Sequence, residues 1–463
     1  GGFLHFGQGK WYPGEQLPRW ALSICWRADG QPCWNDPSLF ADEREVHRYT
    51  AADAEGFIRT LTRKLGLGDE HVRPGHEDTW YYLWRERRLP VNVDPFDARL
   101  DDELERARLR RVFQQGLDAT VGWLLPLRRE WHVGTAGPQW QTGPWFLRDE
   151  RLYLVPGDSP MGYRLPLDSL PWAAKGDQPW TLAQDPFAPQ PPLPVAAAVK
   201  AQFVAPGGVA GSPAAPAAAA AAGADGGLDH DGFHADGAAA FGGAPGVDRM
   251  AFGGPAGPGA TEHSPEYAFR RDAATLPARF VSAGEVTRTA LCVEVRDPQR
   301  GNGPKAERWA EKQHGGKSGV MYVFMPPLRF LEDYLELLAA IEATAAERGV
   351  KIVLEGYPPP RDPRLKQLAV TPDPGVIEVN IHPAHDWDEL VDHTEFLYEA
   401  AHQSRLSTEK FMLDGRHTGT GGGNHFVLGG ATPADSPFLR RPELLTSLIT
   451  YWQNHPSLSY LFS

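Results

Sequence analysis

Acidic and histidine side chains recur in short segments of the sequence where apolar and polar residues alternate. The acids are Glu294, Glu355 and Glu378, and the histidines are His382 and His425. Carboxylates on neighbouring strands repel one another unless a positive charge lies between them. Oxygen ligands with one imidazole suit Mg²⁺ or Mn²⁺ better than zinc, which favours thiolates or several histidines. We therefore expect a divalent-metal site. The alternative is that each acid is simply exposed to solvent on an open sheet.

A glycine-rich segment at 414–425 is the second candidate. Its consecutive glycines, Gly421–Gly423, let backbone N–H groups turn inward, as an anion-binding concavity requires. No Gly-Lys-Ser/Thr follows, which excludes a Walker A loop, and the strand expected after the glycines excludes a dinucleotide fingerprint. Lys410 and Arg416 are placed to neutralise phosphate oxygens, the arginine in bidentate fashion. The segment favours phosphate binding over the alternative, a plain hairpin loop.

Other catalytic classes find little support. Ser159 and Ser436 lack the context of a nucleophile elbow, which disfavours a Ser-His-Asp hydrolase. Cys25, Cys33 and Cys292 have no Cys-protease neighbourhood, and the first two lack zinc-ribbon spacing. A sparse, odd number of cysteines suits a reducing compartment, so we expect packed thiols in a cytoplasmic protein.

Charge and composition narrow the class of protein. Lys and Arg number 46 against 59 Asp and Glu, a net charge of −13, so we expect no broad electrostatic contact with nucleic acid. No apolar run approaches the length that spans a bilayer, and no signal peptide is present, so we expect no membrane contact. The chain begins at Gly1 in a stretch typical of a protein interior, and we treat it as a fragment.

The periodicity of apolar residues predicts the elements that must position these side chains. In the segment 289–297, Leu291, Val293 and Val295 share one face and Cys292, Glu294 and Arg296 the other. Further strands are predicted at 320–325, 351–355, 375–382 and 424–428. Helices are predicted at 101–117, at 328–348 with Gly349 as its cap, from Asp386 onward, and before Pro456. We expect an α+β fold whose antiparallel sheet packs helices on a dry face and lines a cleft with its acid-bearing wet face.

Composition divides the chain into three parts. Residues 1–185 are rich in Trp, Pro and Arg and predict an N-terminal α+β region. Residues 186–265 are dominated by Ala, Gly and Pro, with too few large apolar residues to fold, which predicts a disordered linker or insertion. Residues 266–463 hold the periodic strands and helices of the predicted catalytic domain.

Longer motifs resemble a bacterial amidoligase family. The motifs are Glu355-Gly-Tyr-Pro-Pro-Pro, Pro374-Gly-Val-Ile-Glu-Val-Asn-Ile-His-Pro, the segment 408–425, and Tyr451-Trp-Gln-Asn-His-Pro-Ser-Leu-Ser-Tyr. Pro156-Gly-Asp-Ser-Pro-Met-Gly-Tyr-Arg-Leu-Pro also resembles the middle region of that family. Its members resemble glutamine synthetase in their catalytic domain and are often fused behind a transglutaminase-like domain. The resemblance implies a cupped antiparallel sheet at 266–463, continuing beyond Ser463, and a transglutaminase-like partner domain in cis.

The resemblance also implies a set of site residues. Metal ligands would be Glu355, Glu378 and His425, with Glu294 as a fourth although the paired acids expected on its strand are missing. Arg416 and Lys410 would be catalytic, and the loop residues Gly421, Gly422, Gly423 and Asn424 would bind the cofactor.

The implied reaction is formation of an amide from a carboxylate and an amine, driven by ATP with Mg²⁺ or Mn²⁺ through an acyl phosphate. An amino acid, a peptide, a cell-wall fragment and a protein tail each fit as the substrate, and the sequence does not distinguish between them. Two alternatives remain open: a non-catalytic peptide- or metal-binding module working with the fused transglutaminase-like domain, and a metal-dependent hydrolase that uses no nucleotide.

Overall fold

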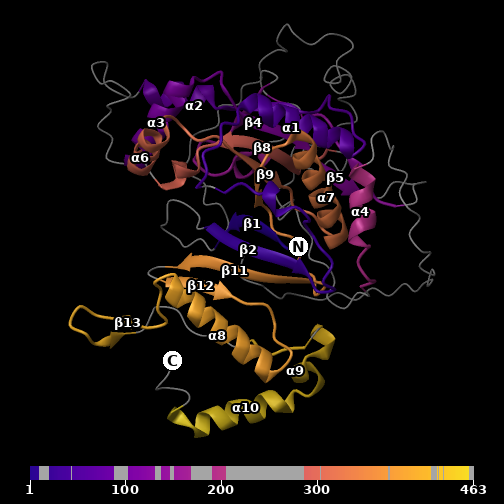
Figure 1. Ribbon diagram of the computed structural model, residues 1–463, viewed down its shortest axis with the longest axis vertical. Helices are drawn as coiled ribbons and strands as arrows, with labels where there is room; N and C mark the ends of the chain where they lie inside the picture. The colour runs from indigo at the N-terminus through magenta and orange to yellow at the C-terminus, as the bar shows by residue number, and fades with distance from the viewer. Residues whose placement is uncertain are drawn as a thin grey trace, which may run out of the picture. The chain divides into compact units, whose positions relative to one another are not determined.

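The computed structural model describes residues 1–9, 20–42, 44–87, 103–130, 137–145, 147, 151–167, 190–204, 286–302, 304–373, 376–418, 425, 427–430 and 432–457 (Figure 1). They form two compact units. Unit 1 comprises residues 1–41, 183–201 and 328–463, and unit 2 comprises residues 42–182 and 202–327. Each unit therefore draws on both the predicted N-terminal region and the predicted catalytic domain.

Unit 1 contains five strands in the order β12-β11-β2-β1-β10. Their bounds are β1 Phe3–Gln8, β2 Trp20–Arg27, β10 Ile352–Gly356, β11 Leu365–Asp373 and β12 Val376–Asn380. Neighbours are antiparallel except for β1 and β10, which run parallel with Phe6 opposite Glu355. The first strand of the chain is therefore paired with a strand from its distant C-terminal half.

Helix α7 (Leu331–Arg348) buries most of its length in unit 1. Gly349 ends it with φ 62°, the left-handed conformation that a glycine adopts without strain, as the sequence predicts. The Tyr334 ring stacks on Phe3 of β1 with ring centroids 6.0 Å apart. Since residues alternate along β1, the face that carries Phe3 and His5 is the dry face of this sheet.

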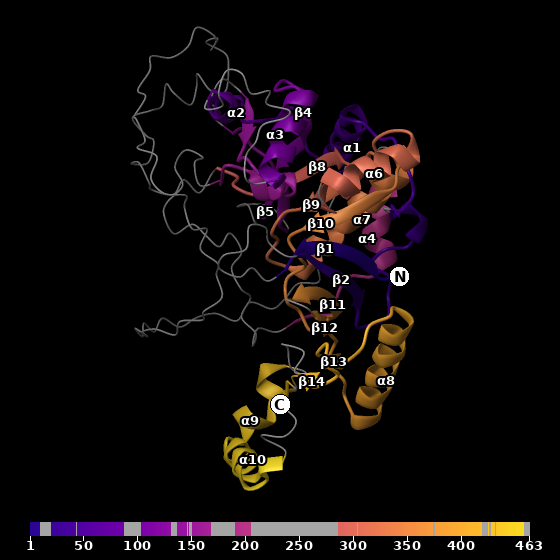
Figure 2. The ribbon, with the colours of Figure 1, turned by 90° about the vertical axis from the view of Figure 1, so that its left-hand side faces the viewer.

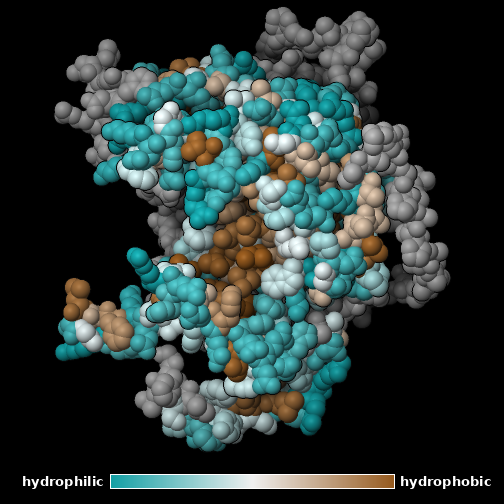
Figure 3. Space-filling model, viewed as in Figure 1, coloured by the Kyte–Doolittle hydropathy of each residue, from teal (hydrophilic) through white to brown (hydrophobic). Residues whose placement is uncertain are grey.

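The opposite face of the unit 1 sheet is partly apolar at the surface. Leu4, Ile24, Ile377 and Val379 are 37–46% exposed. Figure 3 shows hydrophobic side chains gathered over β1 and β2. This side of the sheet is therefore not lined by acidic side chains alone.

Unit 1 contains further helices and short strands, most of them in its C-terminal part. They are α4 (Ala196–Val204, which begins in this unit), η1 Pro37–Leu39, α8 Trp387–Gln403, β13 Lys410–Phe411, β14 His417–Thr418, η8 Pro433–Asp435, α9 Pro437–Arg440 and α10 Glu443–Asn454. Asp386 caps α8 by accepting from the Glu389 N–H at 2.9 Å, which confirms the predicted start of this helix. The described residues of the predicted strand 424–428 are not in a strand, so that prediction is wrong there.

Unit 2 contains five strands in the order β9-β8-β4-β3-β7. Their bounds are β3 Arg73–Glu77, β4 Thr120–Pro126, β7 Leu152–Leu154, β8 Ala290–Arg296 and β9 Val320–Met325. Neighbours are antiparallel except for β3 and β7. A separate hairpin pairs β5 (Arg128–Glu130) with β6 (Gln139–Gln141).

Helix α1 (Ala51–Lys64) packs on β4 and β8 of unit 2, as Figures 1 and 2 show. It begins with a capping box between Thr50 and Asp53. Trp123 donates from its indole N–H to the Ala51 carbonyl at 3.0 Å, and Trp123 lies opposite Val293 in the register. The Val293 face is thus the dry face, and Glu294 points to the other, as its alternation predicts.

The remaining helices of unit 2 are α2 Thr79–Glu86, α3 Glu103–Gln115, α6 Pro304–His314 and the short turns η4 Met161–Arg164 and η7 Pro298–Asn302. α2 and α3 share an apolar cluster of Tyr82, Leu109 and Val112. The predicted charged helix at 101–117 is confirmed, but it has a buried stripe as well as a charged face.

The fold class predicted from the sequence is confirmed: the protein is α+β with mostly antiparallel strands. Most of the predicted linker, 186–265, lies outside the described residues. The three cysteines are buried and form no disulfide. None of the helices in the described part of the chain combines the length and apolarity needed to cross a membrane.

Candidate functional site

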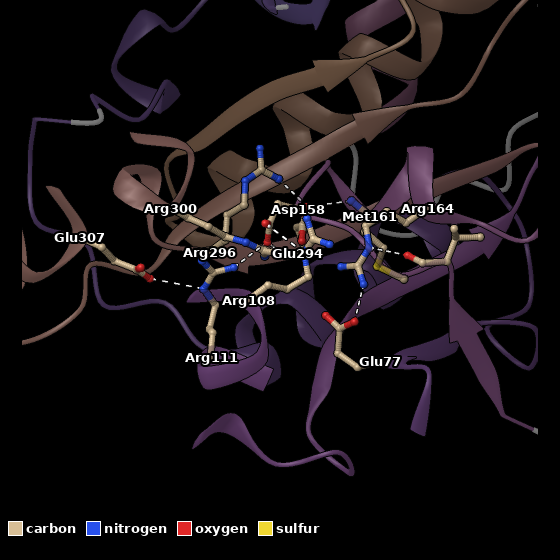
Figure 4. A network of polar contacts seen from close by, with 11 residues as sticks. Glu77, Arg108, Arg111, Asp158, Met161, Arg164, Glu294, Arg296, Arg300 and Glu307 are labelled. Atoms are coloured by element: carbon tan, nitrogen blue, oxygen red, sulfur yellow. Dashed lines mark hydrogen bonds and ion pairs between the residues drawn. The ribbon is translucent and has the colours of Figure 1, made fainter. Parts of the chain in front are cut away.

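Glu294 lies at the centre of a polar network in unit 2 (Figure 4). Its side chain is 3% exposed, and it projects from β8 toward the face opposite α1. One carboxylate oxygen accepts a hydrogen bond from the Met161 backbone N–H at 3.0 Å and another from Arg296. The Arg296 guanidinium also lies over the Tyr322 ring, 3.5 Å from its centroid. Glu294 is thus an acceptor fixed between a backbone amide and a cation.

A tight turn at 156–164 closes over Glu294 because small residues let it approach the sheet. A Cβ on Gly162 would lie 2.2 Å from the Phe324 ring, and one on Gly122 would lie 2.8 Å from both the Met161 sulfur and the Glu294 Cβ. No larger side chain fits at either position without displacing the turn. The two glycines therefore hold the Met161 N–H against the carboxylate.

The same turn supplies Asp158, which binds three arginines. Arg111 donates to it at 2.7 Å and Arg108 at 3.1 Å, both from α3, and Arg300 from η7 donates at 3.3 Å. Burial alone would raise the pKa of Asp158, but the charges of Arg300, Arg108 and Arg111 outweigh it and lower this pKa to about 2. Asp158 is therefore ionised at any physiological pH.

Two further ion pairs complete the network. The turn's Arg164 donates to Glu77 of β3 in a pair buried on both sides, and its Nε donates to the Val155 carbonyl at 2.8 Å. The Arg111 Nε lies 3.5 Å from Glu307 of α6. Among the described residues, five arginines thus meet four carboxylates here. We call Arg108, Arg111, Arg164, Arg296 and Arg300 the arginine cluster.

The arginine cluster has more donors than its carboxylates use. Within the described part of the chain, the Nε of Arg300, the Nε of Arg111 and one Nη of Arg164 are buried without a hydrogen-bond partner. Burial, and then the charge of Arg111, lowers the pKa of Arg300 from its ordinary value, because this guanidinium is not fully compensated. Buried unpaired donors cost free energy unless a ligand satisfies them, and the ligand that matches this geometry is an anion.

Part of the cluster reaches the surface, whereas Arg164 is 2% exposed. The side chains of Arg300, Arg108 and Asp158 are 14–17% exposed, and Arg111 is 16% exposed. Guanidinium forks bind phosphate or carboxylate oxygens in bidentate fashion, so both classes of anion fit. The partly open, arginine-rich surface is therefore a candidate anion-binding site.

The register of unit 1 separates two of the predicted metal ligands. Glu355 of β10 and Glu378 of β12 have three strands between them. The aligned residues on the Glu355 side are Phe6, Leu22, Val370 and Val379. Since Glu378 precedes Val379, it points to the opposite face, and the expectation that the two acids share one face is wrong.

The other two predicted metal ligands, His425 and Glu294, form no close group with Glu355 or Glu378 among the described residues. His425 is exposed, and Glu294 belongs to the arginine cluster of unit 2, where the surrounding positive charge disfavours a divalent cation. The one close group of three potential ligands among the described residues contains none of the four. The described donors therefore give no oxygen-rich set for Mg²⁺.

The predicted phosphate loop is described only at its edges. Arg416 is 83% exposed and lies 3.3 Å from Asp414, and Lys410 is exposed on β13. Gly421, Gly422, Gly423 and Asn424 lie outside the described residues. The roles expected for these residues stay predictions.

The arginine cluster itself was missed by reasoning from the sequence. Asp158 and Arg164 lie in a motif quoted for its resemblance but not for chemistry, and Arg300 and Glu307 lie between the predicted strands 289–297 and 320–325, where no element was predicted. The available signal was the turn Pro-Gly-Asp-Ser-Pro-Met-Gly, whose last glycine, Gly162, allows close packing and whose Asp has no basic residue beside it in the turn.

Comparison with known proteins identifies a family. The family model described as "Putative amidoligase enzyme (DUF2126)" matches residues 1–463, the whole chain. No curated protein and no solved structure matches the chain.

Proposed function

Because the chain belongs to this amidoligase family, we propose that it is a ligase that joins a carboxylate to an amine with ATP, through an acyl phosphate. Family membership supports the ligase class. The observation that carries the finer proposal is the arginine cluster, whose buried unpaired donors suit the phosphoryl group that such a reaction moves.

The main requirement of this reaction is that negative charge is stabilised. A substrate carboxylate oxygen attacks the γ-phosphorus of ATP, ADP leaves, and the acyl phosphate forms. The amine then attacks the acyl carbon, and phosphate leaves with its electron pair while the amine loses a proton. Both steps concentrate charge on phosphoryl oxygens, so catalysis consists mainly of positioning and charge stabilisation.

Arg300, Arg111 and Arg164 are the residues we assign to this charge. Arg300 and Arg164 each have a buried donor that no described residue uses, the Arg111 Nε faces Glu307 at 3.5 Å, and all three arginines are held by a carboxylate: Asp158, Glu307 or Glu77. Such paired arginines are orientated before the anion arrives, so little side-chain entropy is lost on binding. Mg²⁺ stays a prediction from the resemblance.

Transfer of oxygen tests the proposed reaction. The chain is incubated with ATP, ammonium and a set of amino acids and short peptides whose carboxylates carry ¹⁸O. An acyl phosphate passes one ¹⁸O into the released phosphate, and amide and ADP form in equal amounts. ADP without label in the phosphate would contradict the mechanism, and phosphate binding without any ADP release would favour the non-catalytic module.

Arg416 offers a separate test of the glycine-rich loop. If Arg416 stabilises charge that grows in the transition state, Arg416→Ala should lower turnover by about 10²-fold or more while ATP binding changes little. Arg416→Lys should recover only part, because an ammonium cannot copy the bidentate fork. An equal loss in ADP release and in ATP affinity would make Arg416 a ground-state anchor.

A further inference from the structure

A second cluster of potential ligands lies in unit 1, away from any residue assigned to the reaction. His382 follows β12, and Glu389 and His393 are one turn apart on α8. One ligand atom from each lies within 4.8 Å of the other two. The rings of His382 and His393 are 4.3 Å apart between centroids, and the His393 Nε2 is 3.8 Å from a Glu389 oxygen.

The two imidazoles have ring nitrogens that nothing else uses. The Nδ1 atoms of His382 and His393 are buried and have no hydrogen-bond partner among the described residues. The Trp26 ring meets His382 edge-on at 4.9 Å and shields it from water. A buried polar atom without a partner costs free energy, so two of them on neighbouring rings favour a ligand at this cluster.

The third member is held in place by its neighbour. Glu389 accepts the His385 backbone N–H at 2.7 Å, and the His385 ring nitrogen Nδ1 lies 3.3 Å from the same oxygen. The other carboxylate oxygen faces His393. A ligating carboxylate that is itself hydrogen-bonded from outside is the usual arrangement around bound metals.

We propose that His382, Glu389 and His393 bind a zinc ion, which fastens helix α8 to the segment after β12. Two imidazoles and one carboxylate form a donor set typical of zinc, with a fourth position left for water. Zinc ligands lie roughly 3.3 Å apart at bond lengths of about 2.0–2.1 Å, so the three side chains need to close by about 1 Å.

This site is independent of the proposed ligase reaction, so its test reads metal binding rather than activity. The full chain, freed of metal by a chelator, is titrated with Zn²⁺, with Mg²⁺ and with Co²⁺ as a coloured probe. We expect one Zn²⁺ to bind tightly, Mg²⁺ to compete poorly, and Co²⁺ to give the visible absorption of a nitrogen- and oxygen-ligated ion.

Substitutions locate the ion. His382→Ala and His393→Ala should each lower Zn²⁺ affinity by about 10²-fold or more, and His385→Ala by about 10-fold, since even outer partners of a metal site are worth 10- to 100-fold. His402→Ala, an exposed histidine on the same helix, is the matched control and should bind zinc like the unchanged chain.

Glu389→Gln guards against a folding defect, because it keeps the shape of the side chain and removes its charge. In the absence of zinc, this variant should unfold at the same temperature as the unchanged chain. When zinc is added, its unfolding temperature should rise by less than that of the unchanged chain. Unchanged zinc affinity in His382→Ala and His393→Ala, or an absence of zinc binding by the full chain, would overturn the proposal.

Discussion

Two buried carboxylates, one in each unit, show how differently an acid can be accommodated. Glu342 of α7 in unit 1 is 1% exposed and accepts from the backbone N–H groups of Asn35 and Asp36, both at 2.8 Å. The Asn35 side chain donates at 3.0 Å and Lys200 at 3.4 Å. In unit 2, Asp158 meets three arginines, and one of them, Arg300, keeps a buried Nε without a hydrogen-bond partner among the described residues.

The difference lies in what remains unpaired. Around Glu342 the donors match the acceptor oxygens, so the site ties a loop and α4 to α7 and requires nothing more. Around Asp158, buried N–H groups of Arg300 and Arg164 have no hydrogen-bond partner in the described part of the chain, which leaves free energy available to a ligand. A matched carboxylate indicates a structural role, and surplus donors indicate binding.

Removing Arg300 should separate binding from stability most strongly. We expect Arg300→Met to lower turnover by about 100- to 1000-fold, because a donor aimed at the phosphoryl group is lost. The free energy of unfolding should change by less than about 1 kcal/mol, because an undercompensated buried charge is removed as well. ADP release measures turnover, urea unfolding measures the free energy of unfolding, and phosphate titration measures anion binding. A large loss of stability with unchanged turnover would show instead that Arg300 has a structural role, like the donors around Glu342.

Acid should weaken unit 1 before the arginine cluster. Burial lowers the pKa of His5 to about 4, and the backbone of Tyr357 offsets only part of that shift. The unfolded chain takes up this proton near pH 6.5, so the free energy of unfolding should fall by about 3 kcal/mol as the pH drops from about 6.5 to about 4. The stability from Asp158, with its lowered pKa, is lost only as the pH falls from about 4 toward 2.

His5→Gln, which cannot titrate, should flatten the decline between pH 6.5 and 4, and exposed His402→Gln should not. Urea unfolding followed at several pH values measures this slope. An identical slope in His5→Gln would show that another group carries the acid sensitivity.

Glu342, the carboxylate whose donors match its oxygens, should affect stability rather than ligand binding. Glu342→Gln should cost about 2 kcal/mol of stability, because its N–H₂ opposes the Asn35 side-chain donor and the bonds to the Asn35 and Asp36 N–H groups lose their charge, while ATP affinity stays unchanged. Glu347→Gln, on the exposed face of the same helix, is the control and should be nearly neutral. Thermal unfolding and ATP titration of both variants complete the test, and weaker ATP binding by Glu342→Gln alone would remove the distinction.

Gly162→Ala is the smallest and most local change. Its methyl group would press on the Phe324 ring, so the turn must shift at a cost of about 1–2 kcal/mol. Because the Met161 N–H then moves from Glu294, phosphate affinity should fall several-fold as well. Gly157→Ala, in the same turn with open space around it, should leave phosphate affinity unaltered.

Local patterns predicted the elements well but not their assembly. The alternation around Glu294 and the cap at Gly349 depend on neighbours in sequence, and both are confirmed. The faces of Glu355 and Glu378 depend on a register passed through four strand pairs, which no local pattern reveals. The arginine cluster depends on contacts such as Arg300 with Asp158, far apart in sequence, so its residues looked like ordinary surface charges.

The pairing of β1 with β10 sets the order in which the protein can be made. Phe6 leaves the ribosome early, while its partner Glu355 follows on the order of tens of seconds later. Throughout that interval the paired strands β1 and β2 carry Leu4, Trp20 and Ile24 with both edges unpaired, because β10 and β11 are still to be made, and such edges are templates for other chains. The nascent chain therefore depends on a chaperone, or on slow and separate folding of unit 2, until its last third arrives.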